Sequence, residues 1–156
     1  VYLRLNTRSA PIGHSPVELG YAELVHEGHD VGLLVHGTLF REALEAAEQL
    51  DGQGLSVRLV NMRTLKPVDE DAIVETAVGT QLLVTLEDHF VNGGLFSIAA
   101  EVLARRQVAT AVLPLGLNDK WFAPGLYDAV LEAEGFTPQR IAERICEAWR
   151  RADGAR

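Results

Sequence analysis

Apolar and polar positions follow two different periods along this chain. From residue 31 onward, short runs of consecutive apolar residues alternate with longer stretches in which apolar residues recur every three or four positions. The first pattern is typical of strands buried on both faces, and the second is typical of amphipathic helices. Strands are expected at 17–26, 31–36, 55–61, 82–87 and 108–115. Helices are expected at 38–51, 70–79, 95–105, 125–134 and 138–151.

The regular alternation of strands and helices predicts an α/β fold. We expect a three-layer domain with a mainly parallel five-stranded sheet, helices on both faces and one antiparallel strand. Thr38 is expected to cap the helix at 38–51. Thr137 and Pro138 are expected to supply the N-cap and first position of the last helix.

The first sixteen residues have a different character. Residues 1–5 are typical of the end of a strand, and residues 6–16 contain prolines, a glycine and small polar residues that indicate a linker. Because the chain begins inside a strand-like pattern and without methionine, we expect it to be part of a longer polypeptide.

Composition narrows the classes of partner. The 156 residues include 22 acidic and 14 basic side chains, for a net charge of -8. An acidic chain is not attracted to phosphate backbones or anionic membranes, so we expect no nucleic-acid or membrane partner. No apolar run is long enough for a membrane span, and a cytoplasmic protein is expected. Cys146 is the only cysteine and is expected to be a small core or half-buried residue.

Glu87, Asp88 and His89 follow a buried strand, at the sheet edge where open α/β sheets usually place function. Two carboxylates beside a histidine could perform acid–base chemistry or bind a metal. No second histidine lies at ligand spacing to His89, however. The alternative, which we favour, is a polar loop whose histidine forms hydrogen bonds across a domain or subunit boundary.

Gly93 and Gly94 precede a predicted helix. A helix N-terminus with free N–H groups favours an anion, but no complete phosphate-binding motif is present. We favour the alternative that the glycines permit a tight turn and close packing, as part of the same interface.

The remaining candidates are more scattered. Arg4 and Arg8 could together clamp a phosphate, or could be solvated charges. Trp121 and Phe122 could pack at an interface or cover the domain's own core. Four histidines have no partner at ligand spacing: His14, His26, His29 and His36. The best placed of these is His36, which ends a buried strand. No complete catalytic constellation and no metal site is expected.

Several blocks, in order, resemble the C-terminal domain of the thiamine diphosphate-dependent transketolase family. The most specific are VRLVNMRTLKPVDEDAI and EDHFVNGGLFSIAAEVL, and the segment from LGLNDKWF to the EGFT turn is similar to the family's closing segment. The resemblance implies that residues 1–16 are the end of a pyrimidine-binding domain and a linker. Residues 17–152 would then form the C-terminal α/β domain.

The resemblance also implies a chemistry. Such enzymes transfer a two-carbon ketol unit between sugar phosphates, using thiamine diphosphate held with Mg²⁺ or Ca²⁺ by an N-terminal domain and activated by a glutamate of the middle domain. The C-terminal domain mainly supports the dimer. Since this sequence has no GDG triplet followed by a metal-binding asparagine, we expect no catalytic residue here and no cofactor bound by this chain alone.

The family's phosphate-contacting arginine follows a Leu-x-Arg pattern, and the stretch from Arg4 to Arg8 is one residue longer. We assign substrate binding to these two arginines. Two alternatives remain: the C-terminal domain of a 2-oxo acid dehydrogenase beta subunit, and a stand-alone α/β binding or dimerisation module. Expected partners are the cofactor-binding and pyrimidine domains, on the same or a separate chain, and a second copy in a homo-oligomer.

Overall fold

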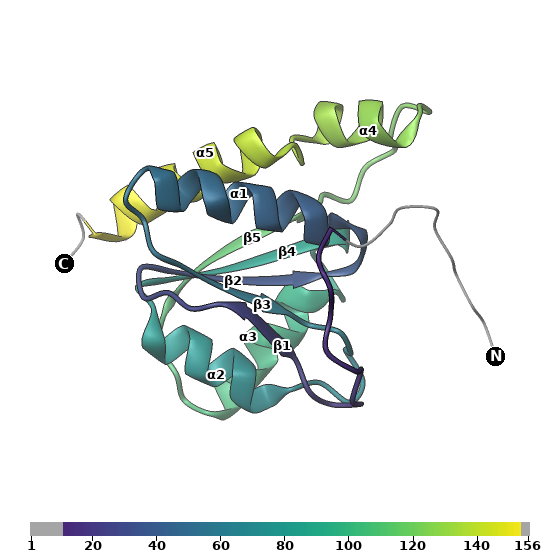
Figure 1. Cartoon of the computed structure of the whole chain (residues 1–156). Helices are drawn as coiled ribbons and strands as arrows, with labels where there is room; N and C mark the ends of the chain where they lie inside the picture. The colour runs from purple at the N-terminus through teal and green to yellow at the C-terminus, as the bar shows by residue number, and fades with distance from the viewer. Residues whose placement is uncertain (1–10, 154–156) are drawn as a thin grey trace.

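The computed structural model describes residues 11–153 (Figure 1). The strands are β1 (Glu23–His26), β2 (Val31–His36), β3 (Val57–Asn61), β4 (Leu82–Phe90) and β5 (Ala111–Leu117). The helices are the 3₁₀ turn η1 (Gly37–Leu39), α1 (Phe40–Gly52), α2 (Glu70–Gly79), α3 (Leu95–Arg105), α4 (Tyr127–Glu134) and α5 (Pro138–Asp153). No helix within residues 11–153 combines the length and apolar character that a membrane span needs.

The five strands form one sheet in the order β1-β3-β2-β4-β5. β2 is parallel to both β3 and β4, and β4 is parallel to β5, whereas β1 pairs with β3 in the antiparallel sense. Figure 1 shows α1 and α5 on one face and α2 and α3 on the other. The predicted three-layer α/β domain with one antiparallel strand is confirmed.

Alternate residues of the central strands build two cores. Leu33 and Val35 of β2 lie in the cluster beneath α1 and α5, whereas Leu34 between them lies in the cluster beneath α2 and α3. All three side chains are fully buried. Fully burying a leucine contributes about 1.5–3 kcal/mol relative to leaving it exposed, so both helical layers are held by apolar burial.

The predicted strand at 17–26 is wrong over its first six residues. Side chains, and not a neighbouring strand, hold the segment that leads into β1. The Gly20 N–H donates to Thr64 Oγ1 at 3.1 Å, and the Ala22 N–H donates to Asp69 Oδ2 at 2.8 Å. Only Glu23–His26 pairs with β3.

Other boundaries also move. Thr38 does not cap α1, because residues 37–39 form a 3₁₀ turn and the Thr38 hydroxyl bonds to Asp88. β5 begins at Ala111 instead of residue 108, since Gln107 takes a left-handed φ of 55° and the Val108 N–H still bonds to the preceding helix at Leu103. The expected cap at Thr137 is present, with its hydroxyl 3.4 Å from the Arg140 N–H.

The TLKPVD block is a structural turn between β3 and α2. Asp69 caps α2 by accepting a hydrogen bond from the Ala72 N–H at 3.0 Å through Oδ1, while its other oxygen holds the Ala22 N–H. A single carboxylate therefore starts a helix and fastens the segment leading into β1.

We expect Asp69→Ala to lower the free energy of unfolding by about 0.5–2 kcal/mol, the usual cost of losing an N-cap. The amide of Ala22 should also exchange with solvent faster, because its acceptor is gone. Denaturant unfolding and hydrogen exchange measure the two effects. Asp69→Asn, which keeps one carbonyl oxygen, is the control; equal losses in both variants would contradict the capping role.

Candidate functional site

β4 bulges where it carries the candidate residues. Leu86 pairs with Leu115 of β5 and Phe90 pairs with Leu117, so four positions on β4 span two on β5. The extra residues lie at Glu87, Asp88 and His89, inside the strand instead of in the loop expected after residue 87. A bulge of this kind redirects the side chains that it carries.

Glu87 is buried and caps α3 from a distance along the chain. Its carboxylate accepts hydrogen bonds from the Leu95 N–H at 2.7 Å and the Phe96 N–H at 3.0 Å, and the residue is only 2% exposed. The N-terminus of α3 favours a negative charge, and the Glu87 carboxylate of the same domain supplies it. Glu87 has no exposed surface for a partner, so any contribution to an interface is through the position of its neighbours.

The two glycines have the geometry that the packing explanation requires. Gly93 has a φ of 85°, which glycine adopts without strain. A Cβ on Gly94 would fall on the Glu87 carboxylate. Gly94 thus gives Glu87 access to the backbone of α3, and an external anion would have to displace that carboxylate.

Asp88 points to the other face of the sheet and joins three elements. The Thr38 hydroxyl donates to Asp88 Oδ2 at 2.7 Å, so the Tyr127 hydroxyl, also 2.7 Å from Thr38 Oγ1, must donate to Thr38. A Cβ on Gly37 would lie 2.5 Å from Asp88 Oδ1. These bonds lie between the carboxyl ends of β2 and β4, where the chain turns outward in opposite directions and where doubly wound sheets usually bind ligands.

His89 and an aromatic rim face outward from the same edge. We define the aromatic rim as Phe90, Trp121 and Phe122. The rings of Phe90 and Phe122 lie 6.1 Å apart, while Trp121 is completely exposed. His89 is exposed and contacts the Phe90 ring, and its Nδ1 lies 3.1 Å from the Phe90 carbonyl.

The other histidines form separate local contacts. The His36 ring donates from Nδ1 to the Met62 carbonyl at 2.6 Å, and the His26 ring donates to the Val57 carbonyl at 2.8 Å. His29 is exposed at the opposite end of the sheet. Among residues 11–153, no three His, Cys, Asp or Glu side chains are grouped closely enough to hold a metal.

His14 belongs to a polar cluster around Glu23 that the sequence did not predict. The His14 ring donates to Glu23 at 2.7 Å, and Arg63 donates to the Ser15 carbonyl at 2.8 Å. Burial works to raise the pKa of Glu23, whereas hydrogen bonds from the Ser15 N–H and the His14 ring lower it. Asn61 and the charge of Arg63 add to the lowering, and the net pKa of Glu23 lies below its ordinary value. This cluster fastens residues 14–16 to the sheet.

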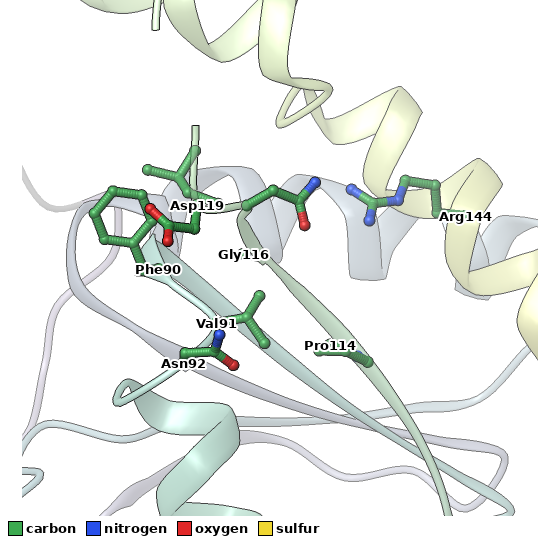
Figure 2. Close-up of a pocket in the computed structure, with 9 residues that line it drawn as sticks. Phe90, Val91, Asn92, Pro114, Gly116, Asp119 and Arg144 are labelled. Atoms are coloured by element: carbon green, nitrogen blue, oxygen red, sulfur yellow. The ribbon is translucent and has the colours of Figure 1, made fainter. Parts of the chain in front are cut away.

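A hollow of about 400 Å³ opens beside the aromatic rim, between the ends of β4 and β5 and helix α5. Figure 2 shows Arg144 extending from α5 toward it, with Asp119 and Phe90 at the opposite side. Arg144 was missed in the sequence, although a signal was present. It occupies the same helix stripe as the buried residues Ile141 and Ile145, where a charge is unusual.

A family model described as the C-terminal domain of transketolase matches residues 20–141. The chain belongs to the transketolase C-terminal domain family. The family resemblance of the TLKPVD and EDH blocks is therefore confirmed. In this transketolase C-terminal domain the two blocks contribute Asp69 and Glu87, which accept hydrogen bonds at the starts of α2 and α3.

The domain is similar to parts of larger proteins. It is 38% identical over 154 residues to a 6-deoxy-6-sulfo-D-fructose transketolase subunit of Clostridium sp., covering 97% of this chain and 48% of that protein. It is 39% identical over 127 residues to a 1-deoxy-D-xylulose-5-phosphate synthase of Nitrosococcus oceani, covering 81% of this chain and 19% of the synthase.

A solved split-gene transketolase, an inactive beta4 tetramer, matches with a TM-score of 0.80 at 36% identity, over 91% of this chain and 46% of that one. The chain therefore spans about half of two of these relatives and about a fifth of the synthase.

The described residues of the transketolase C-terminal domain do not fit a diphosphate and its metal ion. Glu87 occupies the N-terminus of α3, and the hydrogen bond between Thr38 and Asp88 fills the space between the carboxyl ends of β2 and β4. Among residues 11–153, no three His, Cys, Asp or Glu side chains are grouped to hold a metal. Arg4 and Arg8 lie outside the described residues, so their substrate-binding role stays a prediction.

We expect Glu87→Ala to lower the free energy of unfolding by about 1–3 kcal/mol, because it leaves buried N–H groups of α3 without an acceptor. Glu101→Ala, on the exposed side of the same helix, is the matched control and should change it by less than about 0.5 kcal/mol. Denaturant unfolding measures both. Similar values for the two variants would rule out the capping role of Glu87.

Proposed function

We propose that this chain is the C-terminal, non-catalytic domain of a transketolase that transfers two-carbon ketol units between sugar phosphates. Thiamine diphosphate and Mg²⁺ are bound by the cofactor-binding and pyrimidine domains, on the same chain or on a partner chain. The C-terminal domain supports the dimer and holds those domains in place.

This proposal rests on the sheet edge formed by the carboxyl ends of the strands. Some polar side chains at this edge are hydrogen-bonded within the domain, and others are exposed. Glu87 and Asp88, the two candidate acid–base carboxylates, already have partners within the domain. His89 and Trp121 beside them are exposed. An edge with its carboxylates committed and its aromatic side chains exposed is suited to contact with other domains more than to chemistry of its own.

This chain covers only about half of the length of the transketolase relatives. That coverage supports the proposal that other domains bind the cofactor. In the complete enzyme we assign the phosphate contact of the substrate to Arg8, with Arg4 as the second substrate-binding residue. The arginine fork suits a phosphate, and both residues belong to residues 1–16, which the resemblance gives to the end of the pyrimidine-binding domain and its linker.

The decisive assay is ketol transfer from xylulose 5-phosphate to ribose 5-phosphate with thiamine diphosphate and Mg²⁺. We expect no turnover by this chain alone and turnover once the cofactor-binding and pyrimidine domains are supplied. Activity of the isolated chain would overturn the non-catalytic role, and inactivity of the complete enzyme would overturn the transketolase assignment.

A second candidate is synthesis of 1-deoxy-D-xylulose 5-phosphate, favoured by the 39% identity to such a synthase. The same complete enzyme, assayed for that product, distinguishes the two. A third arm replaces the phosphorylated donor by 6-deoxy-6-sulfo-D-fructose, the sugar named in one relative. A 2-oxo acid dehydrogenase would show neither ketol transfer nor synthase activity, but would acylate a lipoyl partner.

We expect His89→Ala to weaken association between subunits or domains of the complete enzyme and to lower its activity, with little change in the stability of this domain. The reason is that His89 is exposed and makes its hydrogen bond only with the adjacent residue. His29→Ala, exposed at the far end of the sheet, is the control. Sedimentation velocity and ketol transfer give the readouts; unchanged association and activity in the His89 variant would refute the interface role.

A further inference from the structure

The hollow beside the aromatic rim is lined in part by the guanidinium of Arg144. Among residues 11–153, no hydrogen bond or ion pair joins Arg144 to another group. Other arginines of the same part of the chain do form ion pairs: Arg58, Arg63, Arg105, Arg106, Arg140 and Arg151. Arg150 and Lys66 have no ion pair among the described residues either, but both are exposed, whereas Arg144 is half-buried.

The position of Arg144 makes the missing partner costly. Its side chain is half-buried on the inner stripe of α5, and burial lowers the pKa of the guanidinium, which still remains charged at neutral pH. A charge that has lost part of its hydration is stabilised by a hydrogen-bonded anion. The fork of N–H donors suits two adjacent oxygens, as carboxylates and phosphates present them.

Neutral donors line the same hollow. The side-chain amides of Asn92 and Asn118 border it, and neither amide is used in a hydrogen bond within the described chain. In Figure 2 the Arg144 guanidinium extends toward the hollow from α5, while Asn92 and Val91 lie on the opposite wall, at the end of β4. Donors from two sides of the hollow therefore face a shared space.

The wall at β5 depends on a glycine. A Cβ on Gly116 would lie 2.9 Å from Val91 Cγ2 and 3.1 Å from the His89 carbonyl oxygen. The absence of a side chain lets the chain after β4 lie against β5, which places Asn92 in the wall of the hollow. The bulge of β4 and the hollow are thus parts of one local arrangement.

Carboxylates near the hollow would repel an anion bound there and so limit its affinity. Asp119 borders the hollow on the side away from Arg144, and it forms no ion pair with another described residue. Glu87 lies behind Gly116, but its charge is directed at the N–H groups of α3. Glu134 is paired with Lys120 at 2.7 Å. Asp119 is therefore the carboxylate that opposes an anion here.

We propose that this hollow is a binding site for the oxyanion group of a small molecule, a phosphate or a carboxylate. Arg144 supplies the charge and a pair of donors, and Asn92 and Asn118 supply neutral donors. The site does not depend on the proposed ketol transfer, because no residue of it takes part in that assignment.

The site can be tested by titrating the ¹⁵N-labelled chain with inorganic phosphate and, separately, with succinate at constant ionic strength. Backbone amide signals of Asn92 and Asn118 report binding, and sodium chloride is the reference anion. We expect a saturable shift with phosphate, succinate or both; whichever anion binds identifies the ligand group. No saturable shift, or the same shift with chloride, would overturn the proposal.

Three variants sharpen the result. Arg144→Gln should weaken binding at least tenfold, because it removes the charge-assisted bonds. Arg151→Gln makes the same charge change two turns further along α5, at an exposed residue that pairs with Glu147, and should leave binding within about twofold. Asp119→Asn should tighten binding severalfold by removing the opposing charge. Equal affinity in the Arg144 and Arg151 variants, or weaker binding in the Asp119 variant, would overturn the proposal. The gain expected for Asp119→Asn keeps the test decisive should the Arg144 variant fold poorly.

Discussion

The buried contact between the Glu87 carboxylate and the N-terminus of α3 determines the arrangement of the whole carboxyl edge. Glu87 faces α3 by strand alternation, one position after Leu86 of the core beneath α1 and α5, and its two backbone hydrogen bonds join β4 to that helix. They also require Gly94, since any Cβ there would occupy the position of the carboxylate. A buried carboxylate is stable only with such donors, so the strand, turn and helix are constrained together.

Strand alternation gives opposite roles to neighbouring residues of β4. Asp88 turns to the α1 face, where it bonds to Thr38 and, through it, to Tyr127 of α4. His89 and the aromatic rim are left facing outward. At the edge where related folds hold ligands, this domain therefore satisfies its own carboxylates and exposes groups suited to contact. This arrangement supports the proposed role of the domain beside catalytic domains.

The spacing of apolar residues along the chain predicts the central strands and helices of the fold. Leu33, Leu34 and Val35 are consecutive apolar residues because β2 is covered on both faces, and that run predicts a central parallel strand. Helix spacing likewise predicts α2 and α3 at their observed bounds. The failures occur where side chains replace backbone partners. Residues 17–22 are held by Thr64 and Asp69, which no local pattern reveals.

The sequence by itself determined the α/β class, the five strands and the edge of the sheet at which Glu87, Asp88 and His89 gather, because hydrophobic period and strand direction are local properties. Only the tertiary structure decided which of these groups is buried, since that depends on residues from distant elements. It alone also places Arg144, in the last helix, beside Asn92 and Asn118. Hydrogen-bond partners and hollows are set by packing between segments far apart in the chain, and no spacing rule encodes them.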